Sequence, residues 1–142
     1  MKTLTTLGIQ SICVASLLVG SASASADNEY PIDAWYKAKT AMDSSTVGLR
    51  RSASEAREKW DAEMNVVYNR LMRRLNKAQQ ENLRDAQRKW LQFRDAESKS
   101  IGAIVATQDG TLAQLAATDG AMELARARVL QLYRYEQALN GF

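Results

Sequence analysis

Residues 53–75, ASEAREKWDAEMNVVYNRLMRRL, carry the clearest periodic pattern in the chain. An α-helix has about 3.6 residues per turn, so side chains three or four positions apart share one face. The apolar residues of this stretch follow that spacing at Ala53, Ala56, Trp60, Met64, Val67, Leu71 and Leu75. The pattern predicts a long amphipathic helix that ends near Asn76 and buries one side.

Three further helices are predicted around it. A short one runs from Pro31 or Ile32 to about Met42, because proline suits the first turn of a helix. Residues 43–46, DSST, then supply turn and cap chemistry. Another begins near Gln79 or Gln80, with an expected buried side of Leu83, Ala86, Trp90, Phe93, Ile101 and Ile104.

The last helix follows a break at residues 108–111, QDGT, where Thr111 is a candidate cap, and stops at Asn140–Gly141. Gly120 predicts either a kink or a close helix contact in it. Its expected buried side chains are Leu112, Leu115, Met122, Ala125, Val129, Leu132 and Leu139. No stretch alternates long enough to predict a strand, so the sequence predicts an all-α fold, an antiparallel helical bundle of one short and three long helices.

The first 26 residues have the features of a signal peptide. Lys2 is their only charge, and an apolar run from Leu7 to Val19 precedes Ala24-Ser25-Ala26, a small-residue cleavage site. Cleavage after Ala24, or retention of the segment as an anchor, is the alternative. We therefore expect residues 27–142 to form a single domain, periplasmic or secreted, with a net charge of +2.

Composition limits the chemistry that this domain can perform. The 142 residues include no His and one Cys, Cys13, which lies within the signal peptide. No imidazole base, intrachain disulfide or multi-Cys zinc site is available. Four nearby acids (Glu55, Glu58, Asp61 and Glu63) alternate with basic residues, which indicates a solvated helix face. We expect no catalytic residues, no cofactor and no metal.

Arg94 is unusual because it falls on the apolar side of its helix. A guanidinium group is not buried without a partner, so a carboxylate is expected nearby. Glu97 is the local candidate, and Glu63 and Glu123 are candidates across the bundle. A structural ion pair is favoured over a ligand-binding role.

Positive charge is concentrated where the second and third helices meet. Seven basic and two acidic residues lie between positions 70 and 89. Such a patch would favour an anionic partner, but a solvated helix end chosen for solubility is the preferred interpretation of the charge alone. Export makes lipid, glycan or an acidic protein more plausible than nucleic acid. We call this set the basic tip: Arg70, Arg73, Arg74, Lys77, Arg84, Arg88 and Lys89.

Two ordered segments resemble a known family. WDAEMNVVY at residues 60–68 and LRDAQRKWLQFRDAE at residues 83–97 are similar to motifs of the DUF1311 family, the lysozyme inhibitor LprI-like N-terminal domain, over roughly residues 46–139. The matching positions are Trp60, Asn65, Tyr68, Gln87, Trp90, Arg94 and Asp95. They predict a packed polar cluster between the second and third helices, with Asp95 pairing to an arginine of the neighbouring helix.

The resemblance implies an exported, non-enzymatic binding protein of the cell envelope that inhibits lysozyme and protects peptidoglycan. Its partner would be a lysozyme, and the basic tip would occlude the catalytic cleft. The alternative is a structural or interaction module that binds an anionic envelope polymer, lipid or glycan, through the basic tip. An enzyme is the least favoured class.

The resemblance also implies a lost disulfide. Many family members carry a Cys pair at the positions that correspond to Ser52 and Ser98. Serine is close to cysteine in size, and both partners are absent together.

Restoring the pair tests this assignment. Ser52→Cys with Ser98→Cys is expected to form a bridge under oxidising conditions and to raise the melting temperature, because a cross-link restricts the unfolded chain. Thiol titration and thermal melts with and without reductant measure both effects. Two free thiols in the oxidised protein would show that the positions do not correspond.

Overall fold

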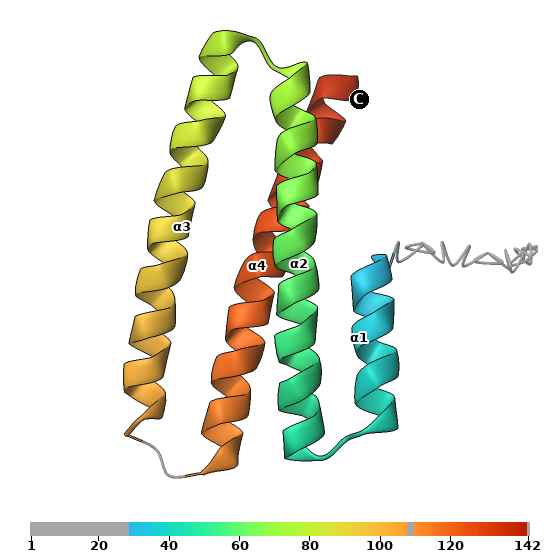
Figure 1. The fold of residues 1–142 in the computed structure, drawn as a ribbon, viewed down its shortest axis with the longest axis vertical. Helices are drawn as coiled ribbons and strands as arrows, with labels where there is room; N and C mark the ends of the chain where they lie inside the picture. The colour runs from blue at the N-terminus through green and yellow to red at the C-terminus, as the bar shows by residue number, and fades with distance from the viewer. Residues whose placement is uncertain (1–28, 108–109, 142) are drawn as a thin grey trace, which may run out of the picture.

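The computed structural model describes residues 29–107 and 110–141 of the chain, which form four helices (Figure 1). They are α1 (Pro31–Met42), α2 (Thr46–Arg74), α3 (Lys77–Val105) and α4 (Thr111–Asn140). No strand occurs among these residues, and the predicted bundle of one short and three long helices is confirmed. The predicted signal peptide lies outside the described residues.

Local side-chain chemistry sets where the helices begin. The Ser45 hydroxyl accepts a hydrogen bond from the Gly48 N–H at 3.1 Å and caps α2. Asn76 and Gln79 cap each other's backbone N–H groups at 3.0 Å, so α3 starts at Lys77, earlier than predicted. Thr111 is the first residue of α4 rather than its cap, which is Gly110 at φ 129°.

Helices α2 and α4 form the centre of the bundle. Consecutive helices alternate in direction, so α2 and α4 run parallel to each other (Figure 1). Helix α1 lies along the N-terminal half of α2, and α3 packs mainly on α4. The ends of α2 and α4 meet at one end of the molecule, next to the α2–α3 turn.

The core is the seam between α2 and α4. The predicted stripe of α2 is buried from Ala53 to Leu71, as are Met122, Ala125, Val129 and Leu132 of α4. Leu83 is the one side chain of α3 buried to the same degree among the described residues. Burial of apolar surface of this kind supplies the main driving force for the fold.

Polar contacts along the seam keep the two helices in register. The Tyr133 hydroxyl donates to Glu63 at 2.6 Å, and Arg70 donates two hydrogen bonds to Glu136, the longer at 2.7 Å. Arg74 donates to Asn140 at 2.7 Å one turn further on. Burial and the adjacent Glu63 carboxylate raise the pKa of Tyr133 to about 12. These pairs join residues 66–70 positions apart, as parallel helices require.

Helix α1 is fixed to α4 as well as to α2. Arg126 donates two hydrogen bonds of 2.8 Å to Asp33, and the Tyr36 hydroxyl donates to Asp119 at 3.0 Å. The ring of Tyr30, just before the helix, stacks on Tyr133 with centroids 5.5 Å apart. The short helix therefore closes the side of the seam opposite α3.

The expected buried sides of α3 and α4 were partly wrong. Phe93 and Ile104 are 52% and 61% exposed, and Ala86 is also exposed. The inward side of α3 instead follows the heptad-like series Gln80, Leu83, Gln87, Trp90, Arg94, Glu97 and Ile101. The prediction was right for Leu83, Trp90 and Ile101, which lie on this side. It was wrong for the other three because polar residues hold several inward positions, and apolarity alone adds outward residues in their place.

On α4, Leu112 is 72% exposed and Leu139 is also exposed, because both lie near the ends of the helix, beyond the central seam. At Gly120 a Cβ would meet the Ile101 side chain of α3 at 3.8 Å, an ordinary van der Waals distance, so the packing there does not require glycine.

Two leucines of α4 test where the core lies. Leu132→Ala removes a fully buried side chain and is expected to lower the free energy of unfolding by about 2–5 kcal/mol. Leu112→Ala removes an exposed side chain and is expected to change it by about 0.5 kcal/mol or less. Urea unfolding followed by circular dichroism measures both. Equal losses would contradict the packing described.

Candidate functional site

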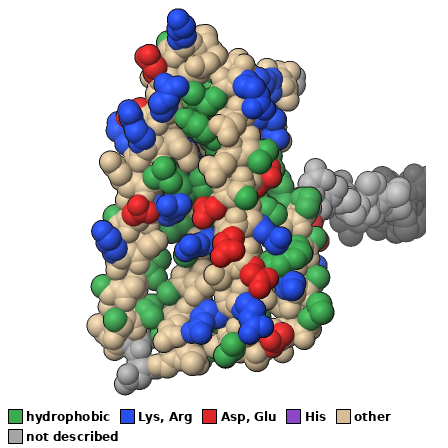
Figure 2. All heavy atoms as spheres, viewed as in Figure 1, with side chains coloured by type: hydrophobic (Ala, Val, Ile, Leu, Met, Phe, Trp, Pro, Cys, Tyr) green, Lys and Arg blue, Asp and Glu red, His purple; other side chains and the backbone are tan. Residues whose placement is uncertain are grey.

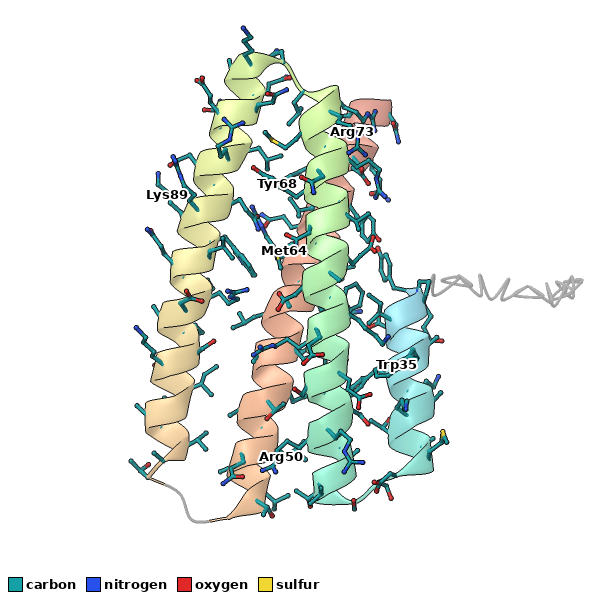
Figure 3. The ribbon with its side chains drawn as sticks, in the orientation of Figure 1. Trp35, Arg50, Met64, Tyr68, Arg73 and Lys89 are labelled. Carbon is teal, nitrogen blue, oxygen red and sulfur yellow. The ribbon has the colours of Figure 1, made fainter. Side chains whose placement is uncertain are left out.

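A groove of about 510 Å³ lies between α2 and α3 and collects most of the family-like motif. Asn65 and Tyr68 enter it from α2, and Gln87 and Arg94 enter it from α3. Figure 3 shows Tyr68 and Met64 on the side of α2 that faces α3. The predicted grouping of these polar residues between the two helices thus corresponds to a groove rather than to a sealed cluster.

Gln87 connects the groove to α4. Its side-chain NH₂ lies 3.1 Å from the sulfur of Met64, and its oxygen accepts a hydrogen bond of 2.9 Å from Nε of Arg128. Arg128 also donates to Gln131 at 2.6 Å. One side-chain amide therefore joins α2, α3 and α4 at mid-height in the bundle.

Arg128 is the most unusual residue of the site. It is only 5% exposed, and its Nη2 atom has no hydrogen-bond partner among the described residues. Neither of its two hydrogen-bond acceptors, Gln87 and Gln131, carries a charge. Burial disfavours the cation and lowers the pKa of Arg128 from its ordinary value, although a guanidinium keeps its proton at neutral pH.

Arg94 has different partners from those predicted. It donates to Asp95 at 3.1 Å on its own helix and lies 3.5 Å from Asp61 of α2. Glu97, Glu63 and Glu123 were the expected partners, and these were wrong. Asp61 lies one turn after Arg57 and reaches toward α3, whereas Glu63 points to the other side and accepts from Tyr133.

Asp95 also differs from its prediction, because it pairs within α3 and not with an arginine of the neighbouring helix. The two motif tryptophans have separate roles. Trp60 is buried in the core, and the half-buried Trp90 ring lies near two cations, 5.5 Å from Arg94 and 5.8 Å from Arg128 between ring centroid and guanidinium carbon.

The residues of the basic tip divide into two sets. Arg70 and Arg74 are held by α4, through Glu136 and Asn140. Arg88 and Lys89 share Asp85, whose pKa is lowered by hydrogen bonds from Lys89 and then Arg88. The remaining three, Arg73, Lys77 and Arg84, have no ion pair among the described residues. Figure 2 shows basic side chains at the hairpin end of the molecule and along α3.

The sequence matches a protein-family model. The model of the family described as "Lysozyme inhibitor LprI" matches residues 37–132, more than half of the sequence. The chain belongs to the LprI family. The resemblance inferred from the two motifs is thereby confirmed, and at family level this is a lysozyme-inhibitor-like protein.

One solved structure supports the fold of this LprI-family chain. It is the crystal structure of an uncharacterized protein from Burkholderia thailandensis, with 31% sequence identity and a TM-score of 0.70. The similarity covers 76% of the present chain and 56% of the other, so the chain spans little more than half the length of that relative. No curated protein matches the sequence.

The two serines of the predicted lost disulfide lie on different helices of the LprI-family bundle. Ser52 is buried on α2, and Ser98 is exposed on α3. Ser98 lines a second groove with Ser54 and Arg57 of α2 and not with Ser52. A disulfide requires Cα atoms about 4.4–6.8 Å apart, so the engineered bridge stays a prediction that also requires α3 to approach α2.

Sequence reasoning missed Arg128 and the role of Asp61. Arg128 is one of three arginines in its helix, with Arg126 and Arg134, and its residue type alone does not indicate that it is buried. The available signal was its position, since Arg128 falls between buried Ala125 and Leu132 at intervals of three and four residues. Within the described residues, no group of three or more acidic, His or Cys side chains could hold a metal ion.

Replacing Arg128 tests whether it stabilises the fold. A buried cation without a carboxylate carries a large desolvation cost. Its two hydrogen-bond partners, Gln87 and Gln131, are only partly buried, so water can replace the bonds that an apolar side chain would leave unmade. Arg128→Met is therefore expected to leave the free energy of unfolding unchanged or to raise it. Urea unfolding measures the difference, with Arg134→Met, an exposed position, as the control. A large loss of stability would mean that Arg128 serves packing.

Proposed function

We propose that this chain is an exported, non-enzymatic binding protein of the cell envelope that inhibits a lysozyme and thereby protects peptidoglycan. Membership of the lysozyme-inhibitor family supports this assignment. The predicted signal peptide supports the location, periplasmic or secreted. In the described part of the chain, no helix is both long enough and apolar enough to cross a membrane.

The observation that carries the proposal is that the α2–α3 hairpin lies at one end of the bundle (Figure 1). Arg73, labelled in Figure 3, and Lys77 are both exposed on it. Lysozymes cleave glycosidic bonds with a pair of carboxylic residues in an open cleft. A protruding turn with unneutralised cations can enter such a cleft, meet those carboxylates and exclude the glycan.

The charge of the whole molecule does not help this encounter. The net charge of +2 on residues 27–142 provides no long-range attraction to a basic enzyme, and many lysozymes are basic. Recognition would then depend on charges within about one Debye length, roughly 8–10 Å, of the contact. Concentration of the cations at one end provides this short-range attraction without a high net charge.

A turbidity assay tests the proposal. Residues 27–142 are expected to inhibit lysis of a bacterial suspension by at least one of several lysozyme types. Arg73→Glu with Lys77→Glu is expected to weaken inhibition at least tenfold, because two attractive contacts become repulsive. Arg51→Glu with Lys99→Glu, the same charge change at exposed positions away from the hairpin, is the control and should inhibit normally.

A second candidate function rests on the same cations. The basic tip could hold the protein to an anionic lipid or glycan of the envelope, as an interaction module without inhibitory activity. Two results together would favour this function over the first. The protein would not inhibit lysozyme even in excess, and it would bind anionic vesicles in a salt-sensitive way that the Arg73 and Lys77 changes abolish.

A further inference from the structure

The groove between α2 and α3 has a surface that the proposed function does not use. Met64, Tyr68 and Leu91 give it an apolar floor, and three arginines (Arg84, Arg88 and Arg94) line it from α3. Asp61 is the one acid among the lining residues. Figure 2 shows hydrophobic side chains between α2 and α3 with basic side chains over α3 beside them.

The arginines are spaced for joint contact with one partner. Arg84 and Arg88 lie one helical turn apart, and Gln87 and Leu91 lie between and after them on the same side. Arg84 has no ion pair among the described residues, and Arg88 pairs only with the exposed, same-helix Asp85, at 3.2 Å. Exposed pairs of this kind contribute little and exchange readily for a better carboxylate.

The wall behind the groove adds a second, independent observation. Arg128 lies directly behind Gln87, 95% buried, with one Nη atom unbonded and no acidic partner. Its charge is not neutralised by any residue that it contacts in the described structure. A buried, uncompensated cation next to a groove favours negative charge in that groove.

The combination of groups selects the chemistry of the occupant. Guanidinium groups bind carboxylates through paired hydrogen bonds. An apolar floor with flanking amides, Asn65 and Gln87, suits side chains and backbone of a peptide better than a bare ion. The groove lies between two long, roughly aligned helices, which is the shape that receives an amphipathic segment.

We propose that the α2–α3 groove binds an acidic, amphipathic peptide segment of a partner protein, with its Glu or Asp side chains on Arg84 and Arg88 and its apolar side chains on Leu91 and Tyr68. This site is distinct from the hairpin turn at Arg73 and Lys77. It does not depend on lysozyme inhibition and holds whether or not that function is correct.

A labelled peptide tests the proposal. The probe is a 12-residue peptide of Glu and Leu in a helical repeat, and the matched control replaces each Glu with Gln. Fluorescence anisotropy is expected to show binding of the acidic peptide to residues 27–142 and at least tenfold weaker binding of the neutral one. Charge-assisted hydrogen bonds account for about that factor each.

Matched variants locate the site. Arg84→Gln with Arg88→Gln is expected to weaken binding of the acidic peptide at least tenfold, whereas Arg73→Gln with Lys77→Gln, which removes the same charge from the hairpin turn, should change it less than twofold. All four residues are exposed, so the variants should fold, and circular dichroism checks this. Leu91→Gln should weaken binding without any change in charge.

Several results would overturn the proposal. Equal losses in the groove and hairpin variants would mean attraction by the general positive field. Equal affinity for the acidic and neutral peptides would show that the arginines do not bind the carboxylates of the peptide. If inorganic phosphate at matched concentration displaces the peptide, the groove is a general anion site. If the protein binds phosphatidylglycerol vesicles through Arg84 and Arg88, the groove is a lipid site.

Discussion

Close packing of α2 against the parallel helix α4 is the constraint on which the rest of the structure depends. Small side chains, Ala53 and Ala56 on α2 and Ala125 on α4, allow the two backbones to approach, and Trp60 and Leu71 fill the space further along. Two parallel helices in direct contact require the intervening helix to return on one side of them. Helix α3 therefore packs on α4, and a groove with an apolar floor and arginines along one side stays open between α3 and α2.

The part of the fold that could be predicted from the sequence is the part governed by apolar burial. The stripe on α2 was correct through Leu71, because nearly every inward position there is apolar. The inward side of α3 was found only in part. Leu83 and Trp90 were placed correctly, but Gln87 occupies an inward position whereas Phe93 is exposed, so hydrophobic periodicity also selected residues that face outward.

The candidate site was predictable only as a set of residues. The family-like motif identified Asn65, Tyr68, Gln87 and Arg94, and these do line one groove. Their partners were not predictable, because they depend on which way each helix turns. Asp61 rather than a glutamate meets Arg94, and Arg128 arrives from α4, a helix that carries no part of the motif. The spacing of Arg128 between buried residues indicates its burial, but no pattern in the sequence identifies the residues that it contacts.

The basic tip, counted as one set of residues, covers two different surfaces: the hairpin turn and the α2–α3 groove. Around the turn, Arg73 and Lys77 are solvated, so salt screens them and a partner gains little by ordering their flexible side chains. In the groove, Arg84 and Arg88 are exposed too, but they stand beside an apolar floor. A partner that covers this floor would displace water and strengthen the contact with each charge. In the two proposals, the same sequence segment provides a weak, adaptable contact at its end and a more selective one along its side. A protein partner that spans both would be held in one orientation, which a cluster of solvated cations alone cannot impose.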